Sequence, residues 1–134
     1  MAPTMYILDE HNTPVPCYEA VQWGIWMEAA RNEQRLHVGS TEVDGMVVST
    51  VFLGLDHNFM GGEPLLFETM IFNKYGSAVD GQSRYHTWQE ADMGHKAVVL
   101  KLKGTVASES EEVAKRYRVV RMGGVKTTKP KGGK

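Results

Sequence analysis

The stretch from residue 46 to residue 95 constrains this chain most, because it alternates strong strand signals with strong turn signals. Residues 46–53 (MVVSTVFL) and 65–72 (LLFETMIF) are rich in the β-branched and aromatic side chains that are typical of strands. A polar, glycine-rich segment at 54–64 separates the two runs. The stretch therefore predicts two strands joined by an irregular loop.

The dipeptide Asp44-Gly45 indicates a third strand, at residues 35–43. It separates residues 35–43 from 46–53, and both of its residues tolerate the positive φ of a two-residue type I′ hairpin turn. The turn fixes the pairing of the two strands. Because 46–53 carries apolar residues on both faces, we expect it to be a central strand. The polar composition of residues 73–84 predicts a second loop.

Residues 17–32 have the periodicity of a helix. Their apolar side chains recur at helical spacing: Tyr18, Val21, Ile25 and Ala29. Trp23 and Trp26 widen this stripe, so we expect the helix to be covered on more than one side, by the sheet and another element or by a second subunit. Gly24 weakens the helix and predicts a close approach of another backbone. Residues 1–16 are rich in turn formers and predict a short edge strand or an extended arm.

A second helix is predicted to begin near Trp88. Thr87 is followed three residues later by Glu90, which is the pattern of a capping box. The apolar stripe of this helix places His95 on the side that faces the core, and Gly104 is a suitable C-terminal cap. These elements predict an α+β fold, in which two main helices cover an antiparallel sheet of three to four strands.

The chain of 134 residues has room for one domain, which we place at 1–104 and follow with an extension at 105–134. The first part carries 7 basic and 13 acidic residues, a sum of −6, and the second carries 8 and 3, a sum of +5. Residues 108–118 predict a short helix, residues 117–122 a strand, and the end of the chain a basic, flexible tail. No signal sequence or membrane span is expected, so we place the protein in the cytoplasm of its cell.

Several polar side chains are candidates for chemistry. The residues that would bind a ligand are Asp56, His57, Asn58, His86 and Trp88. A convergence of Asp56, His57, Glu68 and His95 would suit a divalent metal or acid/base catalysis, because it mixes carboxylates with imidazoles. No known metal, nucleotide or nucleophile motif occurs, so no cofactor is expected and the metal is left open.

Each candidate also has a structural interpretation. Glu68 and His95 both point inward and would satisfy each other by a hydrogen bond. Asp56 and Asn58 would stabilise the turn of their own loop, and His86 with Glu90 would stabilise the first turn of the second helix. The tryptophans, including Trp88, would belong to the core or to a subunit interface. Cys17, the single cysteine, excludes an internal disulfide.

Three segments carry a resemblance when they are taken together: VSTVFLGLDHNF at 48–59, PLLFETMIF at 64–72 and YHTWQEADMGH at 85–95. In this order they resemble a widespread family of small, functionally uncharacterised proteins encoded by bacteriophages and prophages. The resemblance covers between a third and a half of the chain and transfers no catalytic residue. It implies a role in host takeover, in defence against host immunity or in particle production.

These observations leave three functional hypotheses. The first is an oligomeric phage-associated binding protein without enzymatic activity, which engages a host or virion macromolecule or captures a nucleotide signal, either in the host cytoplasm or on the virion. The second is a metal-dependent hydrolase or nuclease that uses Asp56, His57, Glu68 and His95. The third is nucleic-acid or partner binding through the basic tail. Its candidate residues are Arg116, Arg118, Arg121, Lys126, Lys129 and Lys131.

Overall fold

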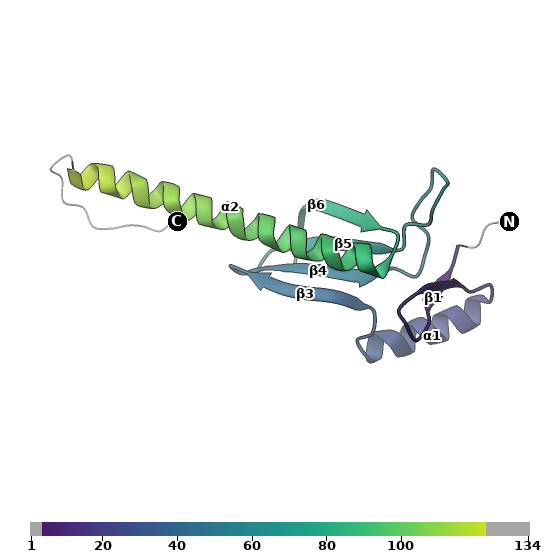
Figure 1. The fold of residues 1–134 in the computed structure, drawn as a ribbon. Coiled ribbons are helices and arrows are strands. Elements are labelled where there is room, and N and C mark those ends of the chain that lie inside the picture. The colour runs from purple at the N-terminus through teal and green to yellow at the C-terminus, as the bar shows by residue number, and fades with distance from the viewer. Residues whose placement is uncertain (1–3, 123–134) are drawn as a thin grey trace. The chain divides into compact units, whose positions relative to one another are not determined.

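The computed structural model describes residues 4–122, except for the side chains of residues 80, 81 and 106–122. Its elements are β1 (Tyr6–Leu8), β2 (Pro14–Pro16), α1 (Ala20–Asn32), β3 (His37–Val43), β4 (Met46–Phe52), β5 (Phe67–Phe72), β6 (Ala78–Tyr85) and α2 (Trp88–Met122). The two helices pack on antiparallel sheets (Figure 1), which confirms the predicted α+β class. No helix among the described residues is long and apolar enough to cross a bilayer.

The main sheet is a meander of four strands in the order β3-β4-β5-β6. Asp44 (φ 51°) and Gly45 (φ 83°) form the β3–β4 turn, so the predicted hairpin is confirmed. β4 pairs with β3 on one side and with β5 on the other, which confirms it as a central strand. The turn therefore determines the register of β3 and β4, as a two-residue turn does.

The predicted loop at 73–84 is wrong, because β6 occupies residues 78–85 and pairs with β5. Only the turn before it is irregular. There the Asn73 side chain accepts the backbone N–H groups of Tyr75 (2.9 Å) and Ser77 (3.0 Å). β6 is an edge strand with a polar sequence, so its backbone pairing with β5, and not an apolar alternation, holds it in the sheet.

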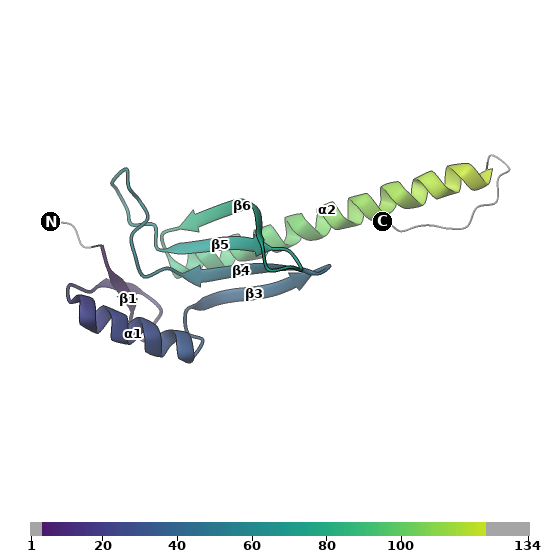
Figure 2. The same cartoon turned by 180° about the vertical axis from the view of Figure 1, so that it is seen from behind.

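The register of β4 and β5 assigns their side chains to two faces. One face, the helix face, carries two opposing pairs, Thr50 with Thr69 and Phe52 with Phe67. The other, the open face, carries Val51 opposite Glu68. The first turns of α2 lie across the helix face, where Trp88 meets the ring of Phe67 edge-on at 6.1 Å between centroids. Figure 2 shows the open face from behind, without a helix across it.

α2 begins as predicted and ends differently. The backbone N–H of Glu90 donates to Thr87 Oγ1 at 3.0 Å, which caps the helix at its predicted start. The helix then continues through Gly104 to Met122, so the predicted end at Gly104 and the strand at 117–122 are wrong. Residues 108–118 are helical as predicted, but they belong to α2 and do not form a separate short helix. A single glycine costs a helix only about 1 kcal/mol, which is too little to end it. The chain divides within α2 into two compact units, Met1–Val99 and Leu100–Lys134.

The N-terminal segment forms a small sheet of its own, β1 with β2, in place of an edge strand of the main sheet. α1 is fixed beside it by Trp23, whose Nε1 donates to the carbonyl oxygens of Tyr6 (3.1 Å) and Gly54 (3.0 Å). Trp26 meets the buried ring of Phe52 edge-on at 6.1 Å between centroids. These contacts join α1 to the core at the end of β4.

The opposite side of α1 differs from the prediction. Its apolar side chains Val21 and Ile25 are exposed by 74% and 64%, and Tyr18, which lies just before the helix, is exposed by 72%. Within the described part of this single chain no element covers them, so the predicted covering by the sheet and another element is wrong. Gly24 was expected to mark a close approach, yet no described atom lies within 4 Å of a Cβ placed there. The second-subunit alternative stays a proposal.

Candidate functional site

The loop between β4 and β5, residues 54–65, is organised by two of the predicted site residues. The Asp56 carboxylate accepts the backbone N–H groups of Asn58 (2.8 Å) and Leu65 (3.0 Å), so one side chain joins the two ends of the loop. The backbone N–H of Asp56 donates to the Thr4 carbonyl at 2.9 Å and ties the loop to the N-terminal segment. Asp56 is therefore a turn former, as its structural interpretation predicts.

Asn58 stabilises the tip of the same loop. Its Nδ2 donates to the Glu63 carbonyl at 2.7 Å, and its Oδ1 accepts the backbone N–H of Met60 at 3.3 Å. Gly61 (φ 88°) and Gly62 (φ 97°) supply the left-handed conformations that close the turn. The side-chain amide thus replaces the backbone ladder that an irregular loop lacks.

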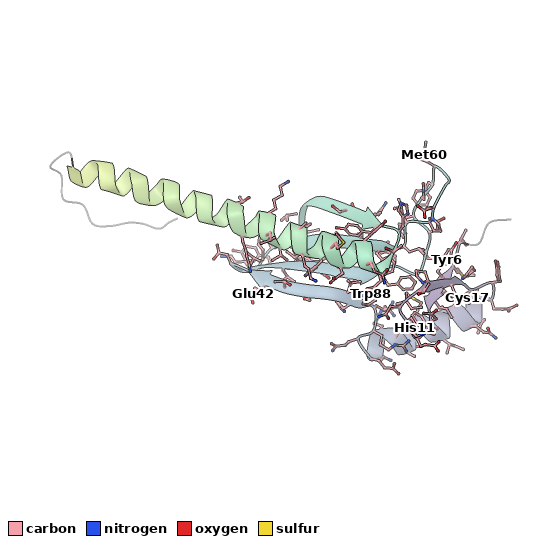
Figure 3. The ribbon with its side chains drawn as sticks, in the orientation of Figure 1. Tyr6, His11, Cys17, Glu42, Met60 and Trp88 are labelled. Atoms are coloured by element: carbon pink, nitrogen blue, oxygen red, sulfur yellow. The ribbon has the colours of Figure 1, made fainter. Side chains whose placement is uncertain are left out.

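This loop presents two large apolar side chains to solvent. Phe59 is 84% exposed and Met60 is 96% exposed, and Figure 3 shows Met60 at the end of the loop. Such exposure within a loop held by side-chain hydrogen bonds is typical of a binding surface, because the backbone is ordered before a partner arrives. We call Phe59 and Met60 the apolar tip. We did not predict it from the sequence, although two large apolar residues before Gly61-Gly62 in a polar loop are a readable signal.

His57 lies in this loop with a defined ring orientation. Its Nδ1 is 2.9 Å from the Leu55 carbonyl oxygen, which only accepts, so Nδ1 carries the proton and Nε2 is the unprotonated nitrogen of the neutral ring. The ring centroid lies 6.0 Å from that of Phe59. The imidazole therefore supports the base of the apolar tip.

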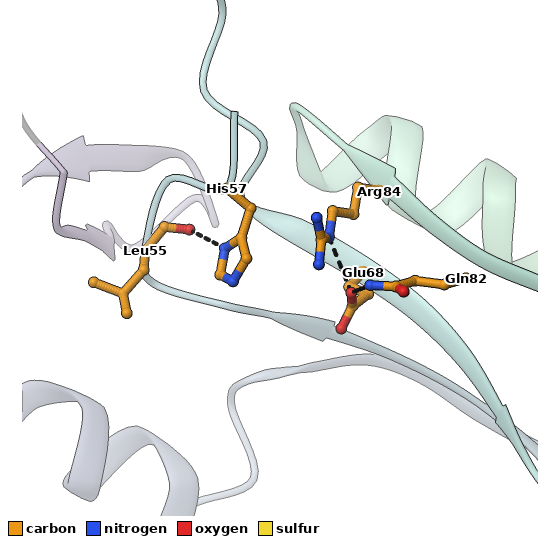
Figure 4. Close-up of polar contacts among 5 residues, drawn as sticks. All are labelled: Leu55, His57, Glu68, Gln82 and Arg84. Atoms are coloured by element: carbon orange, nitrogen blue, oxygen red, sulfur yellow. Dashed lines mark hydrogen bonds and ion pairs between the residues drawn. The ribbon is translucent and has the colours of Figure 1, made fainter. Parts of the chain in front are cut away.

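Glu68 lies on the open face of the sheet and is paired with β6 (Figure 4). Arg84 Nε donates to Glu68 Oε2 at 3.0 Å, and Gln82 Nε2 donates to the same oxygen. The predicted hydrogen bond between Glu68 and His95 is wrong, because the two side chains lie on opposite faces. Neither Gln82 nor Arg84 was predicted, since both fall in the segment that had been interpreted as a loop.

His95 belongs to a hydroxyl network beneath α2. Its Nε2 lies 2.8 Å from Thr41 Oγ1 and its Nδ1 lies 2.7 Å from Thr50 Oγ1. Thr50 Oγ1 is 2.6 Å from Thr69 Oγ1, which also accepts a hydrogen bond of 3.1 Å from the Tyr85 hydroxyl. The neutral ring is therefore satisfied at both nitrogens, and its inward orientation is confirmed.

The environment of His95 keeps its ring neutral. The side chain is only 6% exposed, and this burial lowers the pKa of His95 from its ordinary value. Asp92 raises the pKa and Lys96 lowers it, both with smaller effects than burial. A buried imidazole of this kind, with hydroxyl groups on both nitrogens, joins α2 to the sheet and stabilises the fold.

His86 and Trp88 also have structural roles. His86 donates from Nδ1 to the Pro64 carbonyl at 2.8 Å, and its backbone N–H donates to Glu90 Oε1 at 3.0 Å. The second bond confirms that His86 and Glu90 stabilise the start of α2. Trp88 packs in the core against Phe67, so its core interpretation is confirmed.

The predicted metal set does not form one site. Asp56 and His57 bond within their loop, Glu68 bonds to β6 and His95 bonds beneath α2. In the part of the chain that the structure describes, no three His, Cys, Asp or Glu side chains are grouped so that they would hold a metal ion. The four side chains therefore do not converge on one centre at which they could act together as a hydrolase site.

The basic residues predicted for nucleic-acid or partner binding fall mostly outside the description. The side chains of Arg116, Arg118 and Arg121 belong to the part of α2 that is not described, and Lys126, Lys129 and Lys131 lie outside the described residues.

Comparisons with known proteins leave the site to be interpreted from its own geometry. No family model, no curated protein and no solved structure matches the chain.

Proposed function

We propose that this chain is a bacteriophage-associated binding protein without enzymatic activity, which engages a host or virion protein by inserting the apolar tip into a pocket of that partner. The observation that carries the proposal is the near-complete exposure of Phe59 (84%) and Met60 (96%) on a loop ordered by Asp56 and Asn58. Soluble proteins expose such pairs mainly where a partner covers them.

The charge around the apolar tip narrows the partner. The loop carries two carboxylates, Asp56 and Glu63, and contains no lysine or arginine. Negative charge beside an apolar tip disfavours an anionic lipid surface and favours a protein pocket with a basic rim. The bacteriophage association rests on the sequence resemblance of residues 48–95. This resemblance is the reason that we propose host or virion proteins as the partners.

The magnitude of the effect follows from the exposed area. Burying one large apolar side chain contributes about 1.5–3 kcal/mol to a binding free energy. Because Phe59 and Met60 are almost fully exposed, nearly all of that area is available to a partner. Replacing either side chain with serine is therefore expected to weaken binding at least tenfold.

A differential capture experiment tests this function. Immobilised wild-type protein and the Phe59→Ser/Met60→Ser variant are exposed to lysate of infected host cells, with Tyr75→Ser as the control. Tyr75 is 81% exposed in the turn after β5, so the control removes another exposed aromatic ring. A partner retained by the wild type and by the control, and lost with the apolar tip, supports the proposal. Partners retained equally by all three proteins, or by none, contradict it.

The exposed stripe of α1 supports self-association as a second property of this binding protein. Val21 and Ile25 are one turn apart on α1, as the anchors of a helix-to-helix contact are, and the exposed Tyr18 lies just before the start of the helix. A two-fold axis would pair α1 of one copy with α1 of a second copy in antiparallel orientation. Three side chains form a small interface, so we expect a dimer that dissociates on dilution.

Light scattering after size exclusion tests the dimer. The wild type is expected to show a mass that rises toward twice that of the chain as concentration increases, and Ile25→Glu is expected to stay monomeric. Leu100→Glu is the control, since Leu100 is a comparably exposed apolar residue (70%) on α2. A monomeric wild type at all concentrations, or a dimer that persists in the Ile25 variant, contradicts this interface.

A further inference from the structure

A cavity of about 390 Å³ lies between the C-terminal half of α1 and the adjoining ends of β3 and β4. It is separate from the apolar tip and from the hydroxyl network of His95. Its apolar wall consists of Met27 from α1, Leu36 before β3, Val51 and Phe52 from β4, and Leu53 after β4. These side chains come from α1, from the end of β4 and from the residues that flank β3 and β4, so regular elements hold most of the wall.

The polar part of the cavity consists of three exposed side chains that can each donate hydrogen bonds, Arg31, Gln34 and His37. No carboxylate among the described residues lines the cavity. Among the described residues, none of these three side chains forms a hydrogen bond or an ion pair. The guanidinium of Arg31 is permanently charged and presents a planar fork that matches an oxyanion. The cavity therefore combines an apolar wall with unpaired donors that suit an anionic group.

The backbone of Gln34 gives an independent indication. α1 ends in a Schellman motif, in which the N–H of Gln34 donates to the Arg31 carbonyl at 3.1 Å and the N–H of Arg35 donates to the Ala30 carbonyl at 2.8 Å. Gln34 occupies the left-handed position of this motif with φ 59°, where glycine is the favoured residue. Glutamine is less favourable than glycine at this position, but its side chain lines the cavity, which a glycine could not do.

We propose that this cavity binds a small aromatic anion, with its ring against Met27, Leu36 and Val51 and its anionic group at Arg31. The volume is at the lower end of the range of about 300–1,000 Å³ for ligand sites, so it accommodates one ring system and one anionic group. The planar guanidinium of Arg31 suits a ring, and the thioether of Met27 adds a favourable contact with it.

Three matched probes test the chemical class with the full-length protein. 2-Naphthoate has both the ring and the charge, 2-naphthamide has the ring alone, and octanoate has the charge on an aliphatic chain. Titration is followed by the amide signals of Gln34, Leu36, His37 and Val51 in ¹H–¹⁵N spectra. Naphthoate is expected to bind at least tenfold more tightly than naphthamide, which is the effect of one charge-assisted hydrogen bond. It is also expected to bind more tightly than octanoate, which keeps the charge but lacks the ring that contacts Met27.

Three variants locate the site. Arg31→Gln is expected to remove the preference for naphthoate over naphthamide, and Val51→Phe is expected to fill the cavity and abolish binding of both. Gln34→Gly is expected to melt at a higher temperature than the wild type and to bind naphthoate more weakly, which separates the loss of the side chain from a folding defect. Lys74→Gln, which removes an exposed charge in the turn after β5, is the control and is expected to bind as the wild type does.

The proposal is overturned if octanoate binds as tightly as naphthoate, if Arg31→Gln leaves the charge preference unchanged, or if the shifted amides lie outside the cavity. Shifts of the Phe59 or Met60 amide signals, without shifts at the cavity residues, would place the probe at the apolar tip and would also overturn the proposal.

Discussion

Replacing Asp56 with alanine tests whether the loop that carries the apolar tip is ordered by its own side chains. The change removes the acceptor of two backbone hydrogen bonds, 2.8 Å from Asn58 and 3.0 Å from Leu65. A hydrogen bond to a charged group contributes about 1.5–3 kcal/mol, and because this carboxylate is half-buried, the lower end of that range applies to each of its two bonds. The two bonds together then contribute about 3 kcal/mol, of which water can replace a part. We therefore expect Asp56→Ala to lower the free energy of unfolding by about 1.5–3 kcal/mol.

Urea denaturation followed by tryptophan fluorescence measures this change, and amide hydrogen exchange locates it. The amides of Asn58 and Leu65 should lose protection in Asp56→Ala, and the affinity for the partner should fall although Phe59 and Met60 are intact. Asp56→Asn keeps an acceptor oxygen, so it should lower the free energy of unfolding by only about half as much as Asp56→Ala does. An alanine variant within about 0.5 kcal/mol of the wild type, with both amides still protected, would refute the argument.

Two further predictions concern α2 and α1. Because burial lowers the pKa of His95, the unfolded state binds a proton that the folded state excludes. The free energy of unfolding should therefore be highest above about pH 6.5 and should decrease as the pH falls below that value, by up to about 1.4 kcal/mol per pH unit. His95→Gln should reduce this slope in pH-dependent urea denaturation, and an unchanged slope would contradict the buried neutral ring. Gly94→Ala should destabilise the fold by about 1–3 kcal/mol, because a Cβ there would overlap the Tyr85 ring. Gly24→Ala meets no described atom within 4 Å and should stabilise the fold by up to about 1 kcal/mol, so equal effects of the two changes in thermal melts would contradict the packing of α2 on β6.

Local signals in the sequence predicted much of the fold. The Asp44-Gly45 turn and the capping residues Thr87 and Glu90 act through neighbouring backbone atoms, so their effects are readable without tertiary information. β6 was missed because an edge strand with a polar sequence depends on pairing with β5, which is a tertiary contact. The long α2 was missed because a glycine and an internal capping pattern were given more weight than the helical residues around them.

The candidate site was harder to predict for the same reason. Asp56 and Asn58 were recognised as turn formers because an Asx side chain bonds to backbone close in sequence. The partners of Glu68 and His95 depend on which face of the sheet each residue occupies. A hydrogen bond between the two was excluded only by the register of β4 and β5, which places Val51 opposite Glu68 and Thr50 opposite Thr69.

Site-specific photo-crosslinking tests the central claim most directly. A benzophenone side chain is introduced at the position of Phe59 and, separately, at the position of Tyr75, and each protein is irradiated in infected host cells. We predict a discrete crosslinked protein from position 59 that is absent from position 75 and is lost when Asp56→Ala is added. The same crosslinks from both positions, or no crosslink from position 59, would contradict the role of the apolar tip in binding a partner.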